Sequence, residues 1–291
     1  MNKNIGMIGL GVMGFHIASH LIKNNTIHII ERDSYKTKAF IKKFHKNRNF
    51  TSHKSLNELS NNCSTIISCV GDDKDLNQIF FSKNGILDGL KKNTIIIDHT
   101  TASAVITRKL YKRCKKKTSF FFDAPMSGGE IGAKKGNLSL MVGGDKSKFR
   151  VLKEIVNTYS KSVVYMGKSG SGQLTKMVNQ ICVASIIQGL AEGLYFAKKK
   201  KLNIDDLLQV IKNGAGQSWQ LENRGKTMWR NEFNFGFMNK LMLKDLNLIF
   251  DEIKSSNYEL PITKLIKRKY KKLMDMGFEE EDTSNLIRLL K

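Results

Sequence analysis

Three polar side chains that could take part in proton transfer stand close together in an otherwise apolar stretch, residues 170–200. Lys176 is followed by Asn179 and Gln180, which share its face if the stretch is helical, because they lie three and four positions further on. A lysine in this setting is either a residue whose amine reaches solvent at the start of a helix or a catalytic amine. The remaining motifs decide between the two.

A second group of candidates lies near the start of the chain, where glycines follow an apolar segment. Residues 4–9 have the pattern of a short strand, and residues 15–22 have the pattern of a helix. The turn between them consists of Gly9, Leu10, Gly11, Val12, Met13 and Gly14. This G-x-G-x-x-G spacing allows a tight turn, a close approach of pyrophosphate to the backbone, and close packing of helix and strand. It predicts a dinucleotide site rather than a glycine-rich turn alone.

The next predicted strand, residues 26–30, ends at an acidic residue about 20 positions beyond the glycines. Glu31 is placed to accept hydrogen bonds from the ribose hydroxyls of the adenosine, and its charge would repel a 2′-phosphate, which favours NAD. Arg32 follows it and could hold that phosphate instead. NAD is favoured, and NADP stays open.

Strands and helices continue to alternate through the first half of the chain. Residues 65–70 and 93–97 have the pattern of strands that lead into helical stretches, which predicts a parallel, doubly wound sheet. Ligands bind at the carboxyl ends of the strands in such sheets. The residues near these ends, which either line the nicotinamide half of the cofactor or are ordinary turn residues, are Cys69, Val70, Asp73 and Thr101.

A loop of small residues follows the apolar strand that starts at Phe120. Ser127, Gly128 and Gly129 offer a hydroxyl and successive backbone N–H groups, which together can bind a carboxylate. The same residues also suit a tight turn before a helix. Strands at residues 138–142 and 162–166 complete the first domain near residue 165.

The stretch from residue 171 to 200 is predicted to be one long helix. Its apolar positions extend nearly all the way round, which indicates a buried helix, and its length is on the order of 40 Å. Further helices are expected at residues 204–213, 218–228, 237–254 and 261–276. Among them, Lys244 is either solvated or able to reach the cofactor, and Trp219 and Phe237 are either core residues or walls of a substrate pocket. Residues 166–291 therefore form an all-helical domain.

Composition limits the classes of function. The 291 residues, 41% of them hydrophobic, suffice for two domains. The net charge of +23 suggests that the protein binds nucleic acid. The lysines are scattered and not interleaved with aromatic residues, however, so only weak binding at low salt is expected. Four cysteines without C-x-x-C spacing indicate buried free thiols, with neither disulfides nor a metal site. Without a membrane-spanning run or a cleavable leader, a cytoplasmic protein is expected.

Four motifs in this order, GLGVMG, DAPMSGG, GSGQLTKMVNQ and LKDLNL, resemble those of the β-hydroxyacid dehydrogenase family across essentially the whole chain. That family includes 3-hydroxyisobutyrate dehydrogenase, tartronate semialdehyde, glyoxylate and succinic semialdehyde reductases and, more distantly, 6-phosphogluconate dehydrogenase. The resemblance implies an α/β fold, with an N-terminal Rossmann-type doubly wound sheet joined by the long helix to an all-α C-terminal domain. It also implies a homodimer or homotetramer.

The resemblance further implies roles for individual residues. Lys176 would be the catalytic lysine, the Ser127 to Gly129 loop would hold the substrate carboxylate, and Lys244 would lie near the nicotinamide. Many members have an asparagine four residues after the lysine, where this chain has Gln180, so either Asn179 or Gln180 would contact the substrate.

The expected activity is hydride transfer between a nicotinamide cofactor and a small β-hydroxyacid or its semialdehyde, with Lys176 as general base and acid. The alternative is a non-enzymatic, nucleotide-binding regulator with a basic surface for nucleic acid. The presence of Lys176 together with the Ser127 to Gly129 loop speaks against it. An imine reductase on the same scaffold usually replaces the lysine and ranks lower.

Overall fold

The computed structural model describes residues 3–30, 35–46 and 49–290. The chain divides into two compact units, Met1–Lys176 and Met177–Lys291. The sequence patterns place the boundary near residue 165, whereas this division falls later, inside the long helix α9 (Ser171–Lys199).

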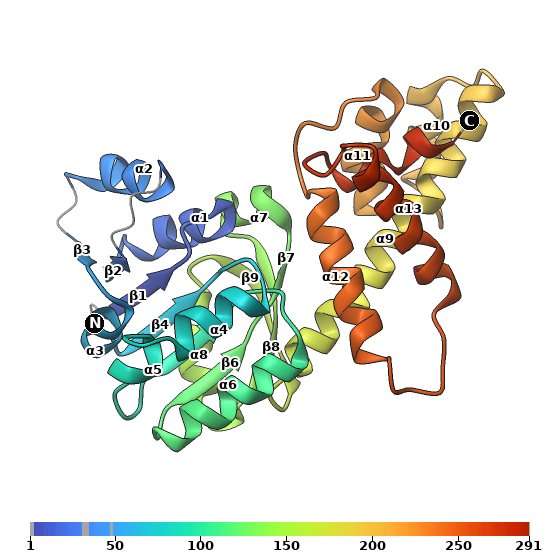
Figure 1. Cartoon of the computed structure of the whole chain (residues 1–291). Coiled ribbons are helices and arrows are strands. Elements are labelled where there is room, and N and C mark those ends of the chain that lie inside the picture. Colours follow the sequence, from blue (N-terminus) through green and yellow to red (C-terminus); the bar gives the residue numbers. More distant parts are fainter. Residues whose placement is uncertain (1–2, 31–34, 47–48, 291) are drawn as a thin grey trace. The chain divides into compact units, whose positions relative to one another are not determined.

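One sheet forms the centre of the first unit (Figure 1). Its strands, in chain order within the described residues, are β1 (Asn4–Ile8), β2 (Thr26–Ile30), β3 (Phe50–His53), β4 (Thr65–Ser68), β5 (Ile95–Asp98), β6 (Phe120–Asp123), β7 (Met126–Ser127), β8 (Leu138–Gly144) and β9 (Ser160–Gly167). The spatial order is β3-β2-β1-β4-β5-β6-β8-β7, and β9 pairs with β8.

The strands from β3 to β6 are all parallel to one another. The next strand, β8, is antiparallel to β6, with Asp123 opposite Gly143, and β9 runs parallel to β8. The expectation of a wholly parallel sheet was therefore wrong for its last strands. The two-residue strand β7 is also antiparallel to β8, so the reversal takes place between β7 and β8, and β7 itself is too short to show any periodicity in the sequence.

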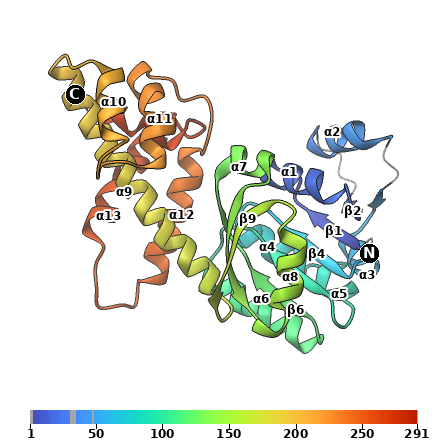
Figure 2. The same ribbon diagram turned by 180° about the vertical axis from the view of Figure 1, so that it is seen from behind.

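Helices cover both faces of the sheet, as Figures 1 and 2 show from opposite sides. Residues of four helices join the hydrophobic core on one face: α1 (Val12–Leu21), α2 (Tyr35–Phe44), α7 (Gly129–Lys135) and α8 (Phe149–Val156). On the other face the core residues come from α3 (Leu56–Asn62), α4 (Asp73–Phe81), α5 (Ile86–Gly89) and α6 (Ala104–Lys116). Neighbouring residues of a strand enter different cores, as Ile96 and Ile97 do, because side chains alternate across a strand.

Strand order reverses between β1 and β4. The chain builds outward from β1 to β2 and β3, then returns to place β4 on the other side of β1. At such a reversal, doubly wound sheets bind their ligands outside the carboxyl ends of the strands. The glycine turn follows directly after β1 and therefore lies at this point of the fold.

The second unit is helical within its described residues. It contains most of α9, followed by α10 (Ile204–Ile211), α11 (Trp219–Arg230), α12 (Asn239–Glu252), α13 (Pro261–Asp275) and the 3₁₀ helix η2 (Thr283–Leu289). Asn203 and Ser218 accept hydrogen bonds from backbone N–H groups at the starts of α10 and α11, which fixes where these helices begin. Apolar residues such as Ile187, Met242 and Ile266 are buried.

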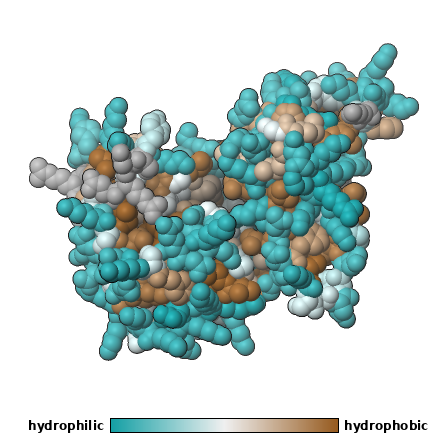
Figure 3. All heavy atoms as spheres, in the orientation of Figure 1, coloured by the Kyte–Doolittle hydropathy of each residue, from teal (hydrophilic) through white to brown (hydrophobic). Residues whose placement is uncertain are grey.

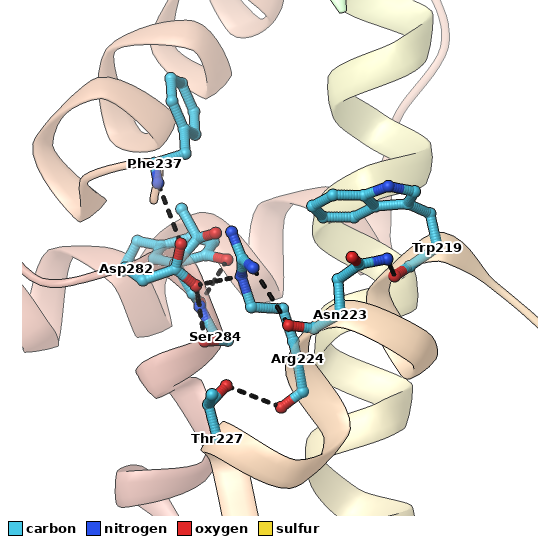
Figure 4. A network of polar contacts seen from close by, with 9 residues as sticks. Trp219, Asn223, Arg224, Thr227, Phe237, Asp282 and Ser284 are labelled. Carbon is cyan, nitrogen blue, oxygen red and sulfur yellow. Dashed lines mark hydrogen bonds and ion pairs between the residues drawn. The ribbon is translucent and has the colours of Figure 1, made fainter. Parts of the chain in front are cut away.

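An ion pair links segments of this unit that are far apart in sequence (Figure 4). Arg224 of α11 donates from Nε to Asp282 Oδ1 at 3.1 Å, and the backbone N–H groups of Phe237 and Ser284 donate to the same carboxylate. The Asp282 side chain is 2% exposed. Gly236 is required beside it, because a Cβ there would lie 1.8 Å from Asp282 Oδ2.

The prediction that α9 is buried on all sides was wrong. Val178 is 60% exposed, Ile186 is 41% exposed, and Cys182 is also exposed rather than buried. These positions recur every four residues, so they lie on one face, which the described chain leaves open. By length and composition α9 is also the one described helix that could cross a membrane, a test that core helices pass as well.

Candidate active site

The glycine turn between β1 and α1 meets the requirements of a dinucleotide site. Gly9 has a φ of +91°, and a Cβ at this position would lie 2.2 Å from the backbone oxygen of Cys69 at the end of β4. A Cβ at Gly14 would lie 1.9 Å from the oxygen of Gly9. At Gly11, by contrast, no described atom lies within 4 Å of such a Cβ. Gly9 and Gly14 are thus needed for packing, whereas Gly11 faces open space.

The start of α1 can receive an anion. Gly11 is the N-cap residue, no described side chain caps this helix, and its first turn contains no acidic residue. The first backbone N–H groups and the positive end of the helix dipole are therefore available to a phosphate group. Val12 in the first turn is 47% exposed, whereas Leu10 is buried. Glu31 and Arg32, predicted to contact the adenosine, lie outside the described residues.

The ends of β4 and β5 come together as predicted for strands of one sheet. Val70 donates its backbone N–H to Thr100 Oγ1 at 3.1 Å, and Cys69 donates its own to the oxygen of Ile8 at 2.9 Å. Thr101 follows Thr100 and is half-buried. Asp73 has a different environment, since its carboxylate accepts hydrogen bonds from the N–H and hydroxyl of Ser103. The Asp73 carboxylate therefore stabilises the loop before α6.

Two buried carboxyl groups face each other at the ends of adjacent strands, Asp98 on β5 and Asp123 on β6. Burial raises the pKa of Asp98 to about 7 and that of Asp123 to about 6. Asp98 Oδ1 accepts hydrogen bonds from Ser68 and Thr100, whereas its fully buried Oδ2 has no hydrogen-bond partner among the described atoms. Asp123 instead accepts from backbone N–H groups at the start of α9.

His99 stabilises the loops beside this pair. Burial lowers the pKa of His99 to about 4, so the ring is neutral near pH 7. Its Nδ1 donates to the oxygen of Ala124 at 2.6 Å, and its Nε2 accepts from the hydroxyl of Tyr159 at 2.9 Å. Both ring nitrogens therefore serve packing between elements, and neither is left for catalysis.

Lys176 lies next to the predicted carboxylate-binding loop. Its side chain is 8% exposed, and Nζ donates to the backbone oxygen of Met126 at 2.9 Å. Met126 is followed directly by Ser127, then by Gly128 and Gly129, whose φ angles are +122° and +59°. The geometry therefore brings together, within the first unit, the amine and the loop that the sequence singled out separately.

In the second unit, Asn179 and Gln180 belong to a connected network. Asn179 donates to Gln180 Oε1 at 2.8 Å, and Gln180 Nε2 donates to Asp245 Oδ2 at 2.7 Å. Lys244 Nζ lies 3.2 Å from the other oxygen of Asp245. Gln180 is 3% exposed, so both ends of its amide serve this network. Sequence reasoning missed Asp245, although it stands in the LKDLNL motif beside Lys244.

The two aromatic residues proposed as pocket walls have different environments. Trp219 is 50% exposed, and its ring lies 5.1 Å from the guanidinium carbon of Arg224 (Figure 4). Phe237 is half-buried. Among the described residues, no group of three or more His, Cys, Asp or Glu side chains is arranged to hold a metal ion.

Comparisons with known proteins cover nearly the whole chain. Residues 4–167 match the family model "NAD binding domain of 6-phosphogluconate dehydrogenase", and residues 170–290 match "NAD-binding of NADP-dependent 3-hydroxyisobutyrate dehydrogenase". A protein of Shewanella frigidimarina named "Uncharacterized oxidoreductase" is 39% identical, over 97% of this chain and 96% of its own. The 2-hydroxy-3-oxopropionate reductase of Escherichia coli is 30% identical, over 98% and 96%.

Solved structures share the fold. The 3-hydroxyisobutyrate dehydrogenase of Mycobacterium tuberculosis, determined with L-serine, superposes with a TM-score of 0.88 over both complete chains at 23% identity. The sheet, its glycine turn and the matched models together define an NAD(P)-dependent oxidoreductase. Within that class, the chain belongs to the β-hydroxyacid dehydrogenase family, which includes the 3-hydroxyisobutyrate dehydrogenases.

Proposed function

We propose that the protein oxidises a small β-hydroxyacid similar to 3-hydroxyisobutyrate, or reduces the corresponding semialdehyde, with Lys176 as general base and acid. The observation that carries the proposal is the hydrogen bond from Lys176 Nζ to Met126, one residue before Ser127. It puts a buried amine beside a turn that suits a carboxylate. A substrate bound by its carboxylate in this turn would present a nearby hydroxyl to the amine.

The turn at Gly128 and Gly129 supports binding of the carboxylate. Positive φ angles at successive residues direct neighbouring N–H groups toward a common point, which favours an anion. No described atom lies within 4 Å of a Cβ built on Gly129, so a ligand can approach the backbone there. The hydroxyl of Ser127 adds a further donor.

Lys176 would move the proton. As a neutral amine, its Nζ accepts the proton of the substrate hydroxyl, and as an ammonium it returns that proton in the direction of reduction. Bound NAD or NADP supplies the hydride acceptor or donor. The residues that would hold its pyrophosphate are those of the Gly9 to Gly14 turn, where Gly11 is open and the N-terminus of α1 is uncapped by any described side chain.

Similar proteins support the class of substrate. The name of the Escherichia coli relative specifies 2-hydroxy-3-oxopropionate, and the Mycobacterium tuberculosis structure was determined with L-serine. Both molecules carry a carboxylate and, on the β-carbon, an aldehyde or a hydroxyl group. We extend this pattern to the present chain, with Asn179 or Gln180 orienting the substrate and Lys244 near the nicotinamide.

A spectrophotometric assay tests the proposal. Purified protein is mixed with NAD or NADP and 3-hydroxyisobutyrate, serine, glycerate, 4-hydroxybutyrate or threonate, and reduced nicotinamide is followed by absorbance. Glyoxylate and succinic semialdehyde are tested with the reduced cofactors. Turnover with at least one of these substrates is expected. Cofactor binding without turnover on the whole panel would contradict the proposed substrate class.

We further propose that NAD is preferred over NADP, because Glu31 follows the second strand. Dissociation constants for NADH and NADPH, measured by fluorescence, test this preference directly. Tighter binding of NADH is expected in the wild type, and Glu31→Ala should reduce the difference. Equal constants in the wild type would contradict the proposal.

We also propose a cytoplasmic homodimer or homotetramer. The exposed apolar residues on one face of α9, among them Val178 and Ile186, support association with a second copy, since apolar surface is stabilised by burial. Light scattering during gel filtration should give a mass of two or four chains, and Ile186→Glu should lower that mass.

Cell fractionation tests the proposed cytoplasmic location.

A further inference from the structure

The segment from Asp123 to Met126 contacts the first two turns of α9 at two points. At one end, Asp123 Oδ1 accepts from the N–H of Gly170 at 2.8 Å and Oδ2 accepts from the N–H of Gln173 at 3.1 Å. At the other end, the oxygen of Met126 accepts from Lys176 Nζ at 2.9 Å. The segment 123–126 therefore contacts both the start of α9 and the amine of Lys176.

The contact at Asp123 is close and fully buried. Asp123 is 0% exposed, and a Cβ added to Gly143 or to Gly172 would lie 2.8 Å from its carboxylate oxygens. The same addition at Gly172 would lie 2.4 Å from the oxygen of Met141. Glycines therefore allow the helix to approach β6 and β8 closely enough for its N–H groups to reach the carboxylate. Each carboxylate oxygen accepts a hydrogen bond from a different backbone N–H group. An asparagine side chain has a single oxygen and could therefore accept from only one of these two N–H groups.

A third contact fixes the same turn from another direction. Gln173 Oε1 accepts from the N–H of Ala102 at 3.1 Å, and its Nε2 donates to the oxygen of Thr100 at 2.7 Å. Gln173 is 1% exposed. The first turn of α9 is therefore attached to the loop after β5 and to the last residue of β6, and Lys176 follows it by less than one helical turn.

We propose that Asp123 is a positioning residue for Lys176: by binding the N–H groups at the start of α9, it sets the position of the amine relative to the Ser127 to Gly129 loop. The importance of this position for catalysis rests on the function proposed above. A shift of about 1 Å in a reacting group can cost on the order of 100-fold in rate, so a small movement of the helix would have a measurable effect.

Chemical labelling of lysines measures the environment of Lys176 without any substrate. Wild-type protein and Asp123→Asn are treated with trace acetic anhydride, and the acetylation rate of each lysine is determined by peptide mass spectrometry. In Asp123→Asn, the rate at Lys176 should rise about tenfold, while that at Lys226 on α11 should stay unchanged. Asp145→Asn is the matched control, because Asp145 caps a 3₁₀ helix in the same unit. It should leave the rate at Lys176 unaltered.

Kinetics and cofactor binding complete the test. With the active substrate, kcat of Asp123→Asn should fall about 100-fold, while NADH affinity and the KM for the substrate stay within about threefold of the wild type. A residue that only stabilises the fold would lower the melting temperature and the number of NADH-binding sites, but not the rate per intact site. Unchanged labelling and unchanged kcat per site would overturn the proposal.

Two further outcomes are separable. If Asp123→Asn does not fold, Asp123→Ser takes its place, since a serine hydroxyl can still accept from one N–H group. Failure of both to fold would overturn the positioning role in favour of a purely structural one. If the wild type proves inactive on every substrate, the proposed function fails, whereas the labelling experiment still decides whether Asp123 fixes Lys176.

Discussion

At the scale of single residues, the proposed chemistry depends on one amine. Lys176 is buried beside Met126, and its nearest candidate substrate contacts belong to the loop that starts at Ser127. Replacement of a general base typically lowers the rate by about 10²–10⁴-fold. Lys176→Ala should therefore lose turnover by at least that factor and still bind NADH, as fluorescence titration would show.

The control for this variant is Lys226→Ala. Lys226 forms a surface ion pair with Asp205 at 2.6 Å and lies far along the chain from the proposed site. It should retain normal turnover. Near-normal turnover in Lys176→Ala would remove the amine from the mechanism, whatever the substrate proves to be.

Two glycines of the same turn should respond differently to alanine. A Cβ at Gly14 would overlap the oxygen of Gly9, whereas a Cβ at Gly11 meets no described atom. Gly14→Ala should therefore lower the melting temperature by several degrees, because the overlap must be relieved by moving α1. Gly11→Ala should keep the wild-type melting temperature and weaken NADH binding at least tenfold. Unchanged NADH affinity in Gly11→Ala would contradict the assignment of Gly11 to the cofactor.

Many residues of the candidate site could be named from the sequence, because they stand in short motifs. The spacing of the glycines after a strand predicts the turn, and in the structure Gly9 and Gly14 have the packing roles that such a turn requires. The contacts of Asp123 and Asp245 were missed. A carboxylate within a motif does not reveal which N–H or amide group it meets, since that partner lies about 50 or more positions away.

At the scale of elements, the ion pair between Arg224 and Asp282 joins α11 to the end of the chain. Removal of one partner from a buried pair leaves an unpaired charge and typically costs about 3–5 kcal/mol. Asp282→Ala should lower the stability of the second unit by that amount, measured by urea unfolding. Asp275→Ala removes an exposed pair with Lys271 and should change the stability by less than about 1 kcal/mol. A small effect of Asp282→Ala would show that the pair adds little.

Some elements could not be read from the sequence. The strand β7 consists of two residues, too few to show a periodicity, and the reversal of direction follows it, between β7 and β8. The helix α9 was correctly expected to be long, but its open face was not expected, because an apolar residue in the sequence does not reveal whether the rest of the chain covers it. The exposure of Cys182 has the same origin.

At the scale of the whole molecule, three buried groups shape the dependence of stability on pH. In the folded state the pKa of Asp98 is raised from 3.8 to about 7, so the stability linked to its proton is full below pH 4 and lost as pH rises toward 7. Asp123, raised to about 6, acts in the same direction. His99 is lowered from 6.5 to about 4, so its contribution is full above pH 6.5 and lost as pH falls toward 4.

Asp98→Asn isolates one of these groups. The asparagine cannot ionise, so the variant should gain stability relative to the wild type as pH rises from 4 to 8, by on the order of 4 kcal/mol at most. Melting temperatures measured across this range would show the difference between the two proteins changing with pH. A constant difference would mean that the pKa of Asp98 in the folded protein is not raised above its value in the unfolded chain.

The net charge of +23 is also a property of the whole chain. Hydrophilic residues cover most of the face shown in Figure 3. Affinity for DNA should therefore be measurable at about 20 mM salt and lost near 150 mM, as expected for scattered charges that only release counterions. Fluorescence anisotropy with a labelled duplex gives both values. Binding that persists at 150 mM would favour the non-enzymatic regulator.

The contacts around Lys176 also bear on how the chain is made. They join residues that are 47, 50 and 73 positions apart, so they cannot form until α9 has left the ribosome. The glycine turn and its neighbouring strands need only the first part of the chain. The segments that form the cofactor turn are therefore synthesised before the amine, and a product terminated before Gly170 lacks the N–H groups that the Asp123 carboxylate binds in the complete chain.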